Sequence, residues 1–254
     1  MQATIVSRRV RVLELDQELG EALDGSSYAS ACERCTARTM TLPAGRCWSL
    51  LDPLDALGHL GLLVLRGVLL YRLHLAGRET VDLLGPGDLI RPWPPVDEYA
   101  ELFTASRWEV LEPARLAALD LQFVREASRS PELLVALSER TASHARSLEL
   151  RLAISQIRQL RSRLQVMLWH LADRFGRVDR YGVLVPLPLS REVLAELVGA
   201  RRESVSRGLK ELAADGTVLP DRHGWRLCDA PPAELSKLQG KCLARAEIPA
   251  SAKA

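Results

Sequence analysis

The chain has 254 residues, 47% of them apolar, which excludes a wholly disordered protein and is long enough for two domains with separate cores. Its 34 basic and 32 acidic residues give a formal net charge of +2, so a nucleic-acid surface would have to arise from local clustering of basic residues. No run approaches the ~20 apolar residues of a membrane helix, and residues 1–9 become charged too soon for a signal peptide. We therefore expect a cytoplasmic protein with no membrane partner.

The stretch from Leu62 to Ile90 alternates short apolar runs with turn residues. Short strands that are punctuated this regularly are typical of a small barrel or sandwich. The sequence that follows, Arg-Pro-Trp-Pro-Pro at residues 91–95, fits neither a helix nor an inner strand and is predicted to be a loop. We predict strands at Leu62–Leu65 and Val68–Leu73, and turns at Arg66-Gly67, Ala76-Gly77-Arg78 and Gly85-Pro86-Gly87-Asp88.

Residues 131–175 are predicted to be helical. Pro131 suits the first position of a helix, and neither glycine nor proline occurs again before Gly176. A stretch of this length favours two consecutive helices over one. Apolar residues at alternating spacings of four and three form a stripe that can pack in a core or supply a dimer seam. The stripe comprises Leu150, Ile154, Ile157, Leu164, Leu168 and Leu171, with Arg161 interrupting it.

Residues 189–215 have the pattern of a helix-turn-helix. Ser190 can cap a first helix, and Gly199 permits the positive φ that a tight turn requires. A second helix is predicted to start near Arg201. The side chains expected to face inward are Leu194, Leu197 and Val198 in the first helix, and Val205, Leu209 and Leu212 in the second.

The opposite face of the second helix is charged and polar. Arg202, Ser206 and Lys210 form one row, and Glu203 and Arg207 form the next. An arginine fork suits guanine and a carboxylate can accept from the cytosine amino group, so this face is typical of a helix that reads the major groove. The alternative is a helix whose charges are merely solvated, because residues 189–229 hold seven basic and seven acidic side chains.

A β-hairpin is predicted to follow the second helix. Residues 216–221 and 225–228 are its expected strands, which together with the two helices make a winged helix. Arg222 at the tip of the wing could touch a phosphate, a contact that positions the protein without specifying sequence. The candidate DNA-binding residues are Ser190, Arg191, Arg201, Arg202, Glu203, Ser204, Ser206, Arg207, Lys210 and Arg222.

From residue 40 to residue 229, the order of these elements resembles the Crp/Fnr superfamily of transcription regulators. The most specific match is residues 198–207, Val-Gly-Ala-Arg-Arg-Glu-Ser-Val-Ser-Arg, which is similar to the family's recognition-helix pattern. The resemblance implies base reading by Arg202, Glu203 and Arg207 on a palindrome with half-sites similar to TGTGA. Gly67 and Gly85–Asp88 look like the turn glycines of the family's barrel, and Leu168–Gly176 looks like the helix that enters its DNA-binding domain.

The resemblance also implies an α+β architecture and a set of partners. The protein would bind double-stranded DNA as a homodimer, work with RNA polymerase and have no enzymatic activity. The expected organisation is an N-terminal segment at 1–38, a cyclic-nucleotide-binding-like β-barrel at 39–128, a long dimerisation helix at 129–155, a C-terminal winged helix-turn-helix at 156–229, and a loose tail at 230–254.

The ligand site of the family's cyclic-nucleotide binders does not carry over. Those proteins use a Gly-Glu pair for the ribose and an Arg-(Ser/Thr) pair for the phosphate. Here residues 88–95 contain no Gly-Glu, Arg107 follows Ser106 instead of preceding it, and Leu148-Glu149 stands in place of a Thr-Ser pair that faces the base. A phosphate without a fixed cation is poorly held, so we do not expect cyclic AMP as the effector.

The cysteines leave an alternative open. Cys32-Glu33-Arg34-Cys35 has a metal-like spacing and is followed by Cys47, while the family's oxygen sensor holds an iron–sulfur cluster on such cysteines. A fourth ligand is not evident, because Cys228 and Cys242 lie in or beyond the DNA-binding region. We therefore expect two plain thiols on a helix before the barrel and no metal or cofactor, with a redox- or metal-responsive regulator using Cys32 and Cys35 as the alternative.

Two further alternatives belong to other classes of protein. A cupin-like enzyme needs clustered histidines, whereas His59, His74, His144, His170 and His223 are scattered and only the first two fall in the barrel. No nucleophile or phosphate-loop signature occurs either. The other alternative is an adaptor whose winged helix binds protein.

Overall fold

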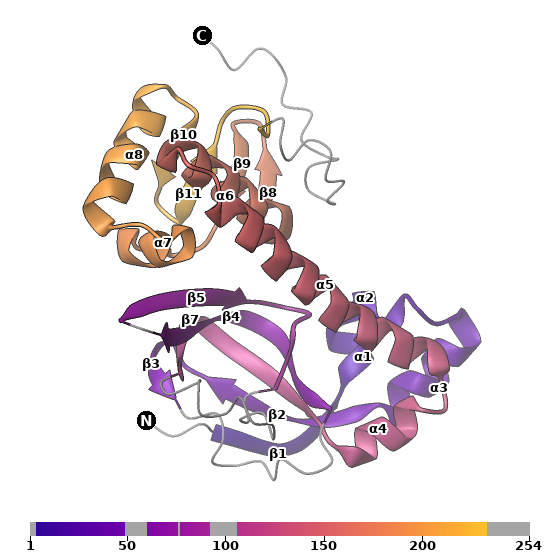
Figure 1. Ribbon diagram of the computed structural model, residues 1–254. Coiled ribbons are helices and arrows are strands. Elements are labelled where there is room, and N and C mark those ends of the chain that lie inside the picture. The colour runs from indigo at the N-terminus through magenta and orange to yellow at the C-terminus, as the bar shows by residue number, and fades with distance from the viewer. Residues whose placement is uncertain (1–3, 49–59, 76, 92–105, 233–254) are drawn as a thin grey trace. The chain divides into compact units, whose positions relative to one another are not determined.

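The computed structural model describes residues 4–48, 60–75, 77–91 and 106–232 (Figure 1). The chain divides into two compact units, residues 1–147 and 148–254, and helix α5, Pro131–Ser155, continues from the first into the second. The predictions made for His59, Cys242, the loop at residues 92–95 and most of the tail fall outside the described residues. In the described ranges, no helix is both long enough and apolar enough to cross a membrane.

The first unit is built on a seven-stranded antiparallel sheet. Its main path has the order β1-β2-β7-β4-β5, with β3 paired to β7 and β6 paired to β4. The two longest strands, β4 and β7, pair with each other over most of their length. The strands are β1 Thr4–Arg11, β2 Thr36–Leu42, β3 Gly45–Trp48, β4 Gly61–Leu75, β5 Arg78–Leu84, β6 Leu89–Ile90 and β7 Ser106–Leu119.

This sheet occupies the place of the predicted β-barrel. Among the described residues no pairing joins β5 to β1, so the barrel is not closed. Its edge strand β1 comes from the segment 1–38 that the sequence places ahead of the barrel. β1 mixes Ile5 and Val6 with Arg8 and Arg9 and shows no clean alternation, so its pairing with β2 leaves little trace in the sequence.

Arg66-Gly67 is a bulge within β4 and not the predicted turn between two strands. β4 pairs with β7 on both sides of this point, and the register shifts between Val64 and Leu69. Gly67 has φ +85°, and a Cβ there would lie 2.4 Å from the carbonyl oxygen of Pro113 on β7. Glycine marks turns and bulges alike, so the residue type could not separate the two.

The turn predicted at Gly85–Asp88 is present. The Asp88 carboxylate accepts a hydrogen bond from the Gly85 N–H at 2.8 Å, and the Gly87 N–H donates to the carbonyl of Val64 at 2.9 Å. Gly87 has φ +87°, and a Cβ there would lie 2.2 Å from a guanidinium nitrogen of Arg140 on α5. The glycine therefore lets α5 approach this turn closely.

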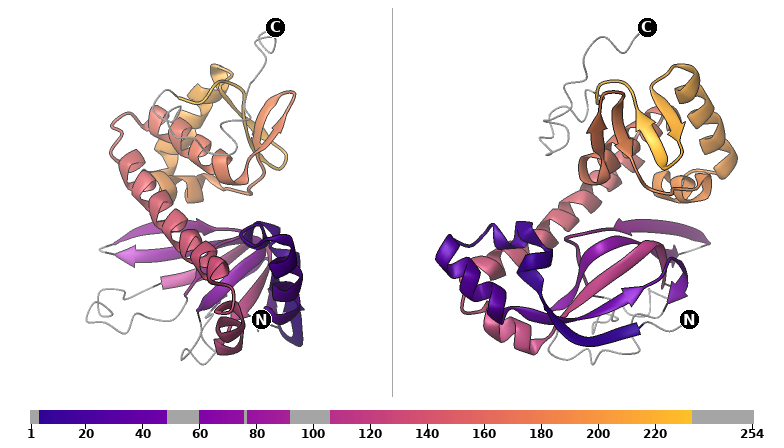
Figure 2. Two further views of the ribbon diagram at one scale, coloured as in Figure 1. Left: turned by 90° about the vertical axis from the view of Figure 1, so that its right-hand side faces the viewer. Right: turned by 180° about the vertical axis from the view of Figure 1, so that it is seen from behind.

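Helices at one end of the sheet complete the first unit (Figure 2). Of the three that precede β2, the sequence predicted only the helix that carries Cys32. Aspartates cap two of the three by accepting hydrogen bonds from the N–H groups of Leu19 and Ser27. Side chains from these helices, the sheet and the start of α5 form one apolar core, which includes Leu13, Phe123 and Leu133. The helices are α1 Val12–Leu15, α2 Gln17–Gly20, α3 Gly25–Arg34 and α4 Leu121–Ala127.

The predicted pair of consecutive helices is present. α5 ends at Ser155 and α6 covers Leu160–Phe175, with the junction at residues 156–159 between them. The junction divides the predicted apolar stripe, because Ile157 lies within it. Ile154 before it and Leu164, Leu168 and Leu171 after it are no more than 4% exposed, so the stripe packs in a core.

The second unit is a winged helix. α6 packs with α7, Arg191–Val198, and α8, Arg202–Ala214. A four-stranded antiparallel sheet of order β10-β11-β9-β8 completes the unit. The wing strands β10, Val218–Asp221, and β11, Gly224–Leu227, lie where the sequence predicts them. The sequence analysis missed the other hairpin, β8 Arg177–Asp179 and β9 Gly182–Val185.

We expect Gly67→Ala to lower the free energy of unfolding by about 2 kcal/mol or more, because alanine is strained at positive φ and its Cβ meets backbone. Gly77→Ala is the matched control, since φ is +73° there but no atom lies within 4 Å of a new Cβ. It should cost only about 1 kcal/mol. Urea unfolding would measure both, and equal losses would contradict a close approach at Gly67.

Candidate nucleic-acid interface

α7 and the turn that follows it have the predicted geometry. The hydroxyl of Ser190 accepts a hydrogen bond from the Val193 N–H at 3.2 Å and so caps the helix. α7 ends at Gly199, which has φ +62°, and the Ala200 N–H returns to the carbonyl of Ala195 at 2.9 Å. A left-handed residue at this point ends one helix and redirects the chain into the next.

α8 buries one face completely. Val205, Leu209 and Leu212, the three residues predicted to face inward, are no more than 4% exposed. Gly208 lies on the same buried face, where a Cβ would approach the Leu164 side chain of α6 to 2.9 Å. Because glycine lacks that atom, α8 can pack closely against α6.

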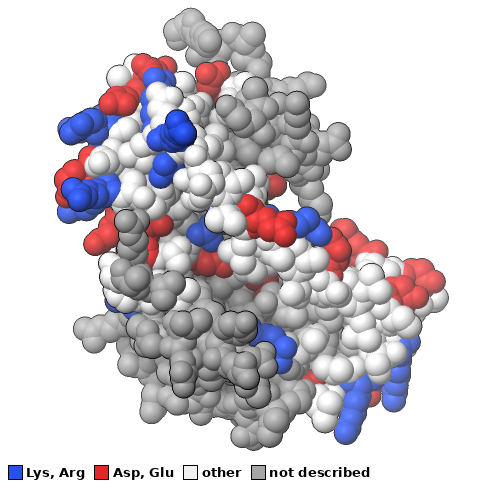
Figure 3. Space-filling model, in the orientation of Figure 1, with Lys and Arg blue, Asp and Glu red and all other residues white. Residues whose placement is uncertain are grey.

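The opposite face of α8 gathers five of the predicted site residues. Four are exposed and Ser206 is half-buried. On this side of the molecule basic side chains project outward with acidic ones between them (Figure 3). Within the described residues, the basic members of the group form no ion pair. Together the five line a shallow hollow: Arg202, Glu203, Ser206, Arg207 and Lys210.

The N-terminus of α8 carries no side-chain cap. Arg201 occupies the N-cap position, and its side chain makes no capping hydrogen bond. The first backbone N–H groups of a helix have no partner within the helix and carry partial positive charge. Exposed Arg201 and Ser204 flank these groups. An anion can therefore be bound at this end of α8.

The remaining predicted residues lie on other elements. Ser190 and Arg191 are exposed at the start of α7, and Arg222 is exposed at the tip of the wing beside His223. None of them lines the hollow on α8. The structure thus brings half of the ten predicted residues together on one surface. Arg201 and Ser204 lie at the N-terminal end of α8, and the other three lie on neighbouring elements of the same unit.

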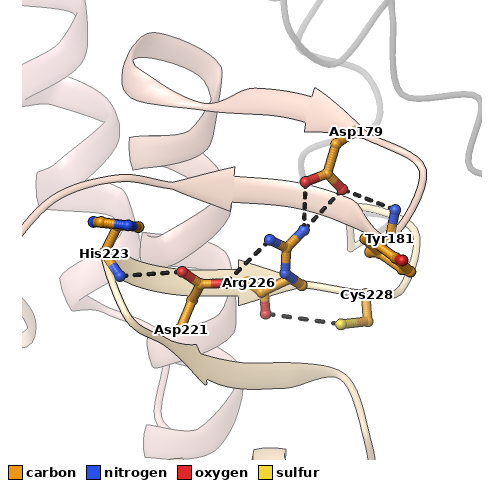
Figure 4. A network of polar contacts seen from close by, with 6 residues as sticks. All are labelled: Asp179, Tyr181, Asp221, His223, Arg226 and Cys228. Carbon is orange, nitrogen blue, oxygen red and sulfur yellow. Dashed lines mark hydrogen bonds and ion pairs between the residues drawn. The ribbon is translucent and has the colours of Figure 1, made fainter.

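Arg226 of β11, which the sequence analysis did not single out, holds both hairpins of the second unit (Figure 4). One guanidinium nitrogen donates to the two carboxylate oxygens of Asp179 at 2.7 and 2.8 Å, and another donates to Asp221 at 3.0 Å. The same carboxylates accept from the backbone N–H groups of Tyr181 at 2.8 Å and His223 at 3.1 Å. Each aspartate therefore fixes its own turn, and Arg226 joins the two.

The charges of this network support one another. Burial tends to raise the pKa of Asp179, but the hydrogen bonds from Arg226 and from the Tyr181 N–H outweigh it and lower that pKa. The backbone N–H of His223 and the Arg226 side chain lower the pKa of Asp221. The Asp179 carboxylate in turn raises the pKa of Arg226. The carboxylates remain charged, so the wing is held in one arrangement at neutral pH.

Comparisons with known proteins agree with this geometry. Residues 162–232 match the family model of the Crp-like helix-turn-helix domain. The chain is 32% identical over 152 residues to the cyclic AMP receptor protein of Thermus thermophilus, a match that covers 59% of this chain and 66% of that protein, just under two thirds. Residues 162–232 thus form a Crp-like helix-turn-helix domain, and the longer match supports a likeness to Crp/Fnr regulators.

Solved structures of several bacterial proteins share the fold, each at less than 25% sequence identity. A CRP-family transcriptional regulator from Thermus thermophilus has a TM-score of 0.54 at 23% identity, over 74% of this chain and 91% of that one. A cyclic nucleotide-binding domain containing protein from Listeria monocytogenes has a TM-score of 0.62 at 17% identity, over 85% and 97%. The CooA mutant from Carboxydothermus hydrogenoformans has a TM-score of 0.60 at 17% identity, and the match covers 89% of this chain and 94% of that one.

The two cysteines considered for a redox or metal role are free thiols in the first unit. Cys32 is 7% exposed on α3, and Cys35, which follows it, is fully buried. Burial raises the pKa of the Cys35 thiol to about 11. A thiol with so high a pKa is a poor nucleophile and a poor ligand at neutral pH, so these surroundings do not favour a sensor based on this pair. The side chain of Cys47 lies outside the described residues.

Histidines are not clustered in the described part of the first unit. His74 is exposed on β4, whereas His144 lies on α5, where its Nε2 is 3.1 Å from Asp82 of β5. No group of three potential metal ligands occurs among the described residues. Nothing in this arrangement favours the cupin-like alternative.

We expect Arg226→Gln to lower the melting temperature of the second unit by a few degrees at neutral pH, because both carboxylates lose their cation. Both aspartates have lowered pKa values when folded, so their contribution is present above the unfolded pKa near 4 and is lost as the pH falls through the folded pKa. The difference between wild type and variant should therefore shrink below about pH 4. Melting curves across that range would show it, and a constant difference would contradict the pairing.

Proposed function

We propose that this protein is a sequence-specific regulator of transcription that binds a palindromic DNA site as a homodimer. The observation that carries the proposal is the exposed face of α8, where Arg202, Glu203 and Arg207 surround one hollow while the opposite face is buried. One side of α8 packs against its domain, while the other side carries arginines that can donate paired hydrogen bonds and a carboxylate that can accept them. Such a helix fits a major groove. The Crp-like helix-turn-helix match covers the same residues.

The contacts divide into two kinds. Arg202, Glu203 and Arg207 would meet base edges, as the family pattern implies, and the half-sites would be similar to TGTGA. Phosphate contacts would come from the exposed backbone N–H groups at the start of α8 and from further polar and basic side chains of the same unit. Those side chains are Ser190, Arg191, Arg201, Ser204, Ser206, Lys210 and Arg222.

An exposed apolar stripe on α5 supports the homodimer. Leu148 is 41% exposed and Leu152 is 67% exposed, and these two lie on one face of the helix with exposed Ala145 and Thr141, at spacings of four and three. Two copies of such a stripe can bury each other. A dimer would place two recognition helices about one DNA turn (~34 Å) apart, which is what a palindrome requires.

The effector is proposed not to be cyclic AMP. Described side chains on one face of the sheet form a closely packed apolar core, which contains Leu69, Trp108 and Val110, and the ring of Trp108 lies 4.7 Å from that of Tyr71. A nucleotide phosphate needs a cation, which these side chains do not offer. Contacts of α5 with the sheet unit offer a route for another signal, since Arg140 lies 3.0 Å from Asp16 and packs on Gly87.

We expect selection from a randomised DNA pool to enrich a two-fold palindrome, with the same result in the presence and absence of cyclic AMP. Arg202→Ala and Arg207→Ala should each weaken binding to that palindrome about tenfold or more and relax the base preference. Arg177→Ala on β8 removes the same charge from an exposed position in the same unit and serves as the control. Unchanged affinity in both α8 variants would contradict base reading by this face, and failure to enrich any palindrome would point to an adaptor. A strong requirement for cyclic AMP would contradict the proposal that the effector is another molecule.

The dimer has its own test. Leu148→Glu combined with Leu152→Glu should convert the protein to a monomer, because the interface would then bury like charges. Val135→Glu is the matched control, since Val135 is 69% exposed on a different face of the same helix. Sedimentation analysis would give the masses. A monomeric wild type, or a double variant that stays dimeric, would contradict a dimer interface on α5.

A further inference from the structure

Arg163, in the first turn of α6, is not among the predicted DNA-binding residues, yet it donates several hydrogen bonds within the second unit. Its Nε donates to the carbonyl of Ile157 at 2.8 Å, and its Nη2 donates to the same oxygen at 2.6 Å. Its Nη1 donates to the carbonyl of Val198 at 2.9 Å. One guanidinium therefore binds two carbonyls that are 41 residues apart in the sequence, since 198 − 157 = 41.

Each of these carbonyls lies where the backbone changes direction. Ile157 belongs to the junction at residues 156–159, between the end of α5 and the start of α6. Val198 is the last residue of α7, directly before the left-handed Gly199 that starts the turn into α8. Carbonyls at helix ends lack the N–H partner that the next turn would supply, and a partly buried one needs another donor. Arg163 supplies it at both places.

The chemistry of the arginine suits this task. A guanidinium is planar and stays charged at all physiological pH values, so its fork holds two directions at once. Hydrogen bonds from a charged donor are roughly twice as strong as neutral ones, and a cation is favoured at the negative end of the α7 dipole. A lysine could reach one carbonyl at a time but could not fix the angle between the two.

We infer that Arg163 is a positioning residue that ties the turn of the helix-turn-helix to the α5–α6 junction and thereby fixes the direction of α8 relative to the end of α5. This rests on the proposed function, because the direction of α8 matters only if α8 reads DNA. In a dimer paired through α5, the backbone direction at the junction determines the direction of each subunit's recognition helix. Loss of these hydrogen bonds should leave the contacts with each half-site intact but weaken the preference for one spacing between the half-sites.

The test uses the full-length protein as Arg163→Gln and Arg163→Lys, with Arg158→Gln as the matched control. Arg158 is an exposed arginine in the same junction, so its variant removes the same charge without touching either carbonyl. Melting temperatures would establish that all variants fold. The lysine variant keeps the charge and one bond, which keeps the inference testable if the glutamine variant is unstable.

Hydrogen exchange followed by mass spectrometry is the first readout, and it does not depend on DNA. Arg163→Gln should speed exchange both at residues 156–159 and at residues 199–201, with Arg163→Lys between it and wild type. Faster exchange at the junction alone, or at neither segment, would overturn the tie. Arg158→Gln should leave the turn unchanged.

The second readout is the affinity for duplexes carrying the palindrome enriched by the wild-type protein, with the spacer at its selected length and one or two base pairs longer. Each added pair turns one half-site by about 34–36° relative to the other. Arg163→Gln should bind the selected spacer about tenfold more weakly and discriminate less between spacers. If Arg163→Gln exchanged faster but still discriminated fully between spacer lengths, the hydrogen bonds of Arg163 would only stabilise the fold, and the positioning role would be overturned. Failure of the wild type to enrich any palindrome would instead count against the proposed function, and the exchange data would still decide the tie.

Discussion

Burial of one face of α8 determines which of its side chains can meet a partner. Val205, Leu209 and Leu212 are almost completely buried, and full burial of such side chains is worth about 1.5–3 kcal/mol each. A rotation of the helix by one residue, 100°, would expose them and bury charged groups. No surface ion pair could offset that cost, because exposed pairs contribute only ~0–1 kcal/mol. The hydrophobic face therefore fixes the outward face, and the turn at Gly199 and the tie from Arg163 fix the direction in which it points.

The helix-turn-helix was predictable because its signals are local. Ser190, Gly199 and the apolar spacing of α7 and α8 each act within a few residues, so sequence and structure agree nearly residue by residue. The features that were missed depend on distant pairing. The bulge at Gly67 needs its partner on β7, and the bonds of Arg163 and Arg226 span 35 and 47 residues. The periodicity of a sequence indicates local structure and does not predict such distant contacts.

The nearly neutral charge of the DNA-binding region does not describe the outer face of α8, where three basic side chains and one acidic side chain line the hollow. Residues 189–229 hold equal numbers of basic and acidic side chains, seven of each, which argued against a generally basic surface. In the structure some of the acidic groups are occupied within the unit: Asp221 pairs with Arg226, and Asp215 pairs with Arg161. The basic side chains on the outer face of α8 form no such pair among the described residues. The local field on that face is accordingly more positive than the composition of the region indicates.

α5 runs from the unit that contains the seven-stranded sheet into the unit that contains the winged helix. It has 25 residues, roughly 37 Å at 1.5 Å per residue, and its first half is held by Arg140 against Asp16 and by His144 against Asp82. Its last buried side chain, Ile154, lies three residues before Ile157, where Arg163 is bound. Because Arg163 binds both the junction and the end of α7, a change of backbone direction at the junction would move the turn of the helix-turn-helix with it instead of unwinding that turn.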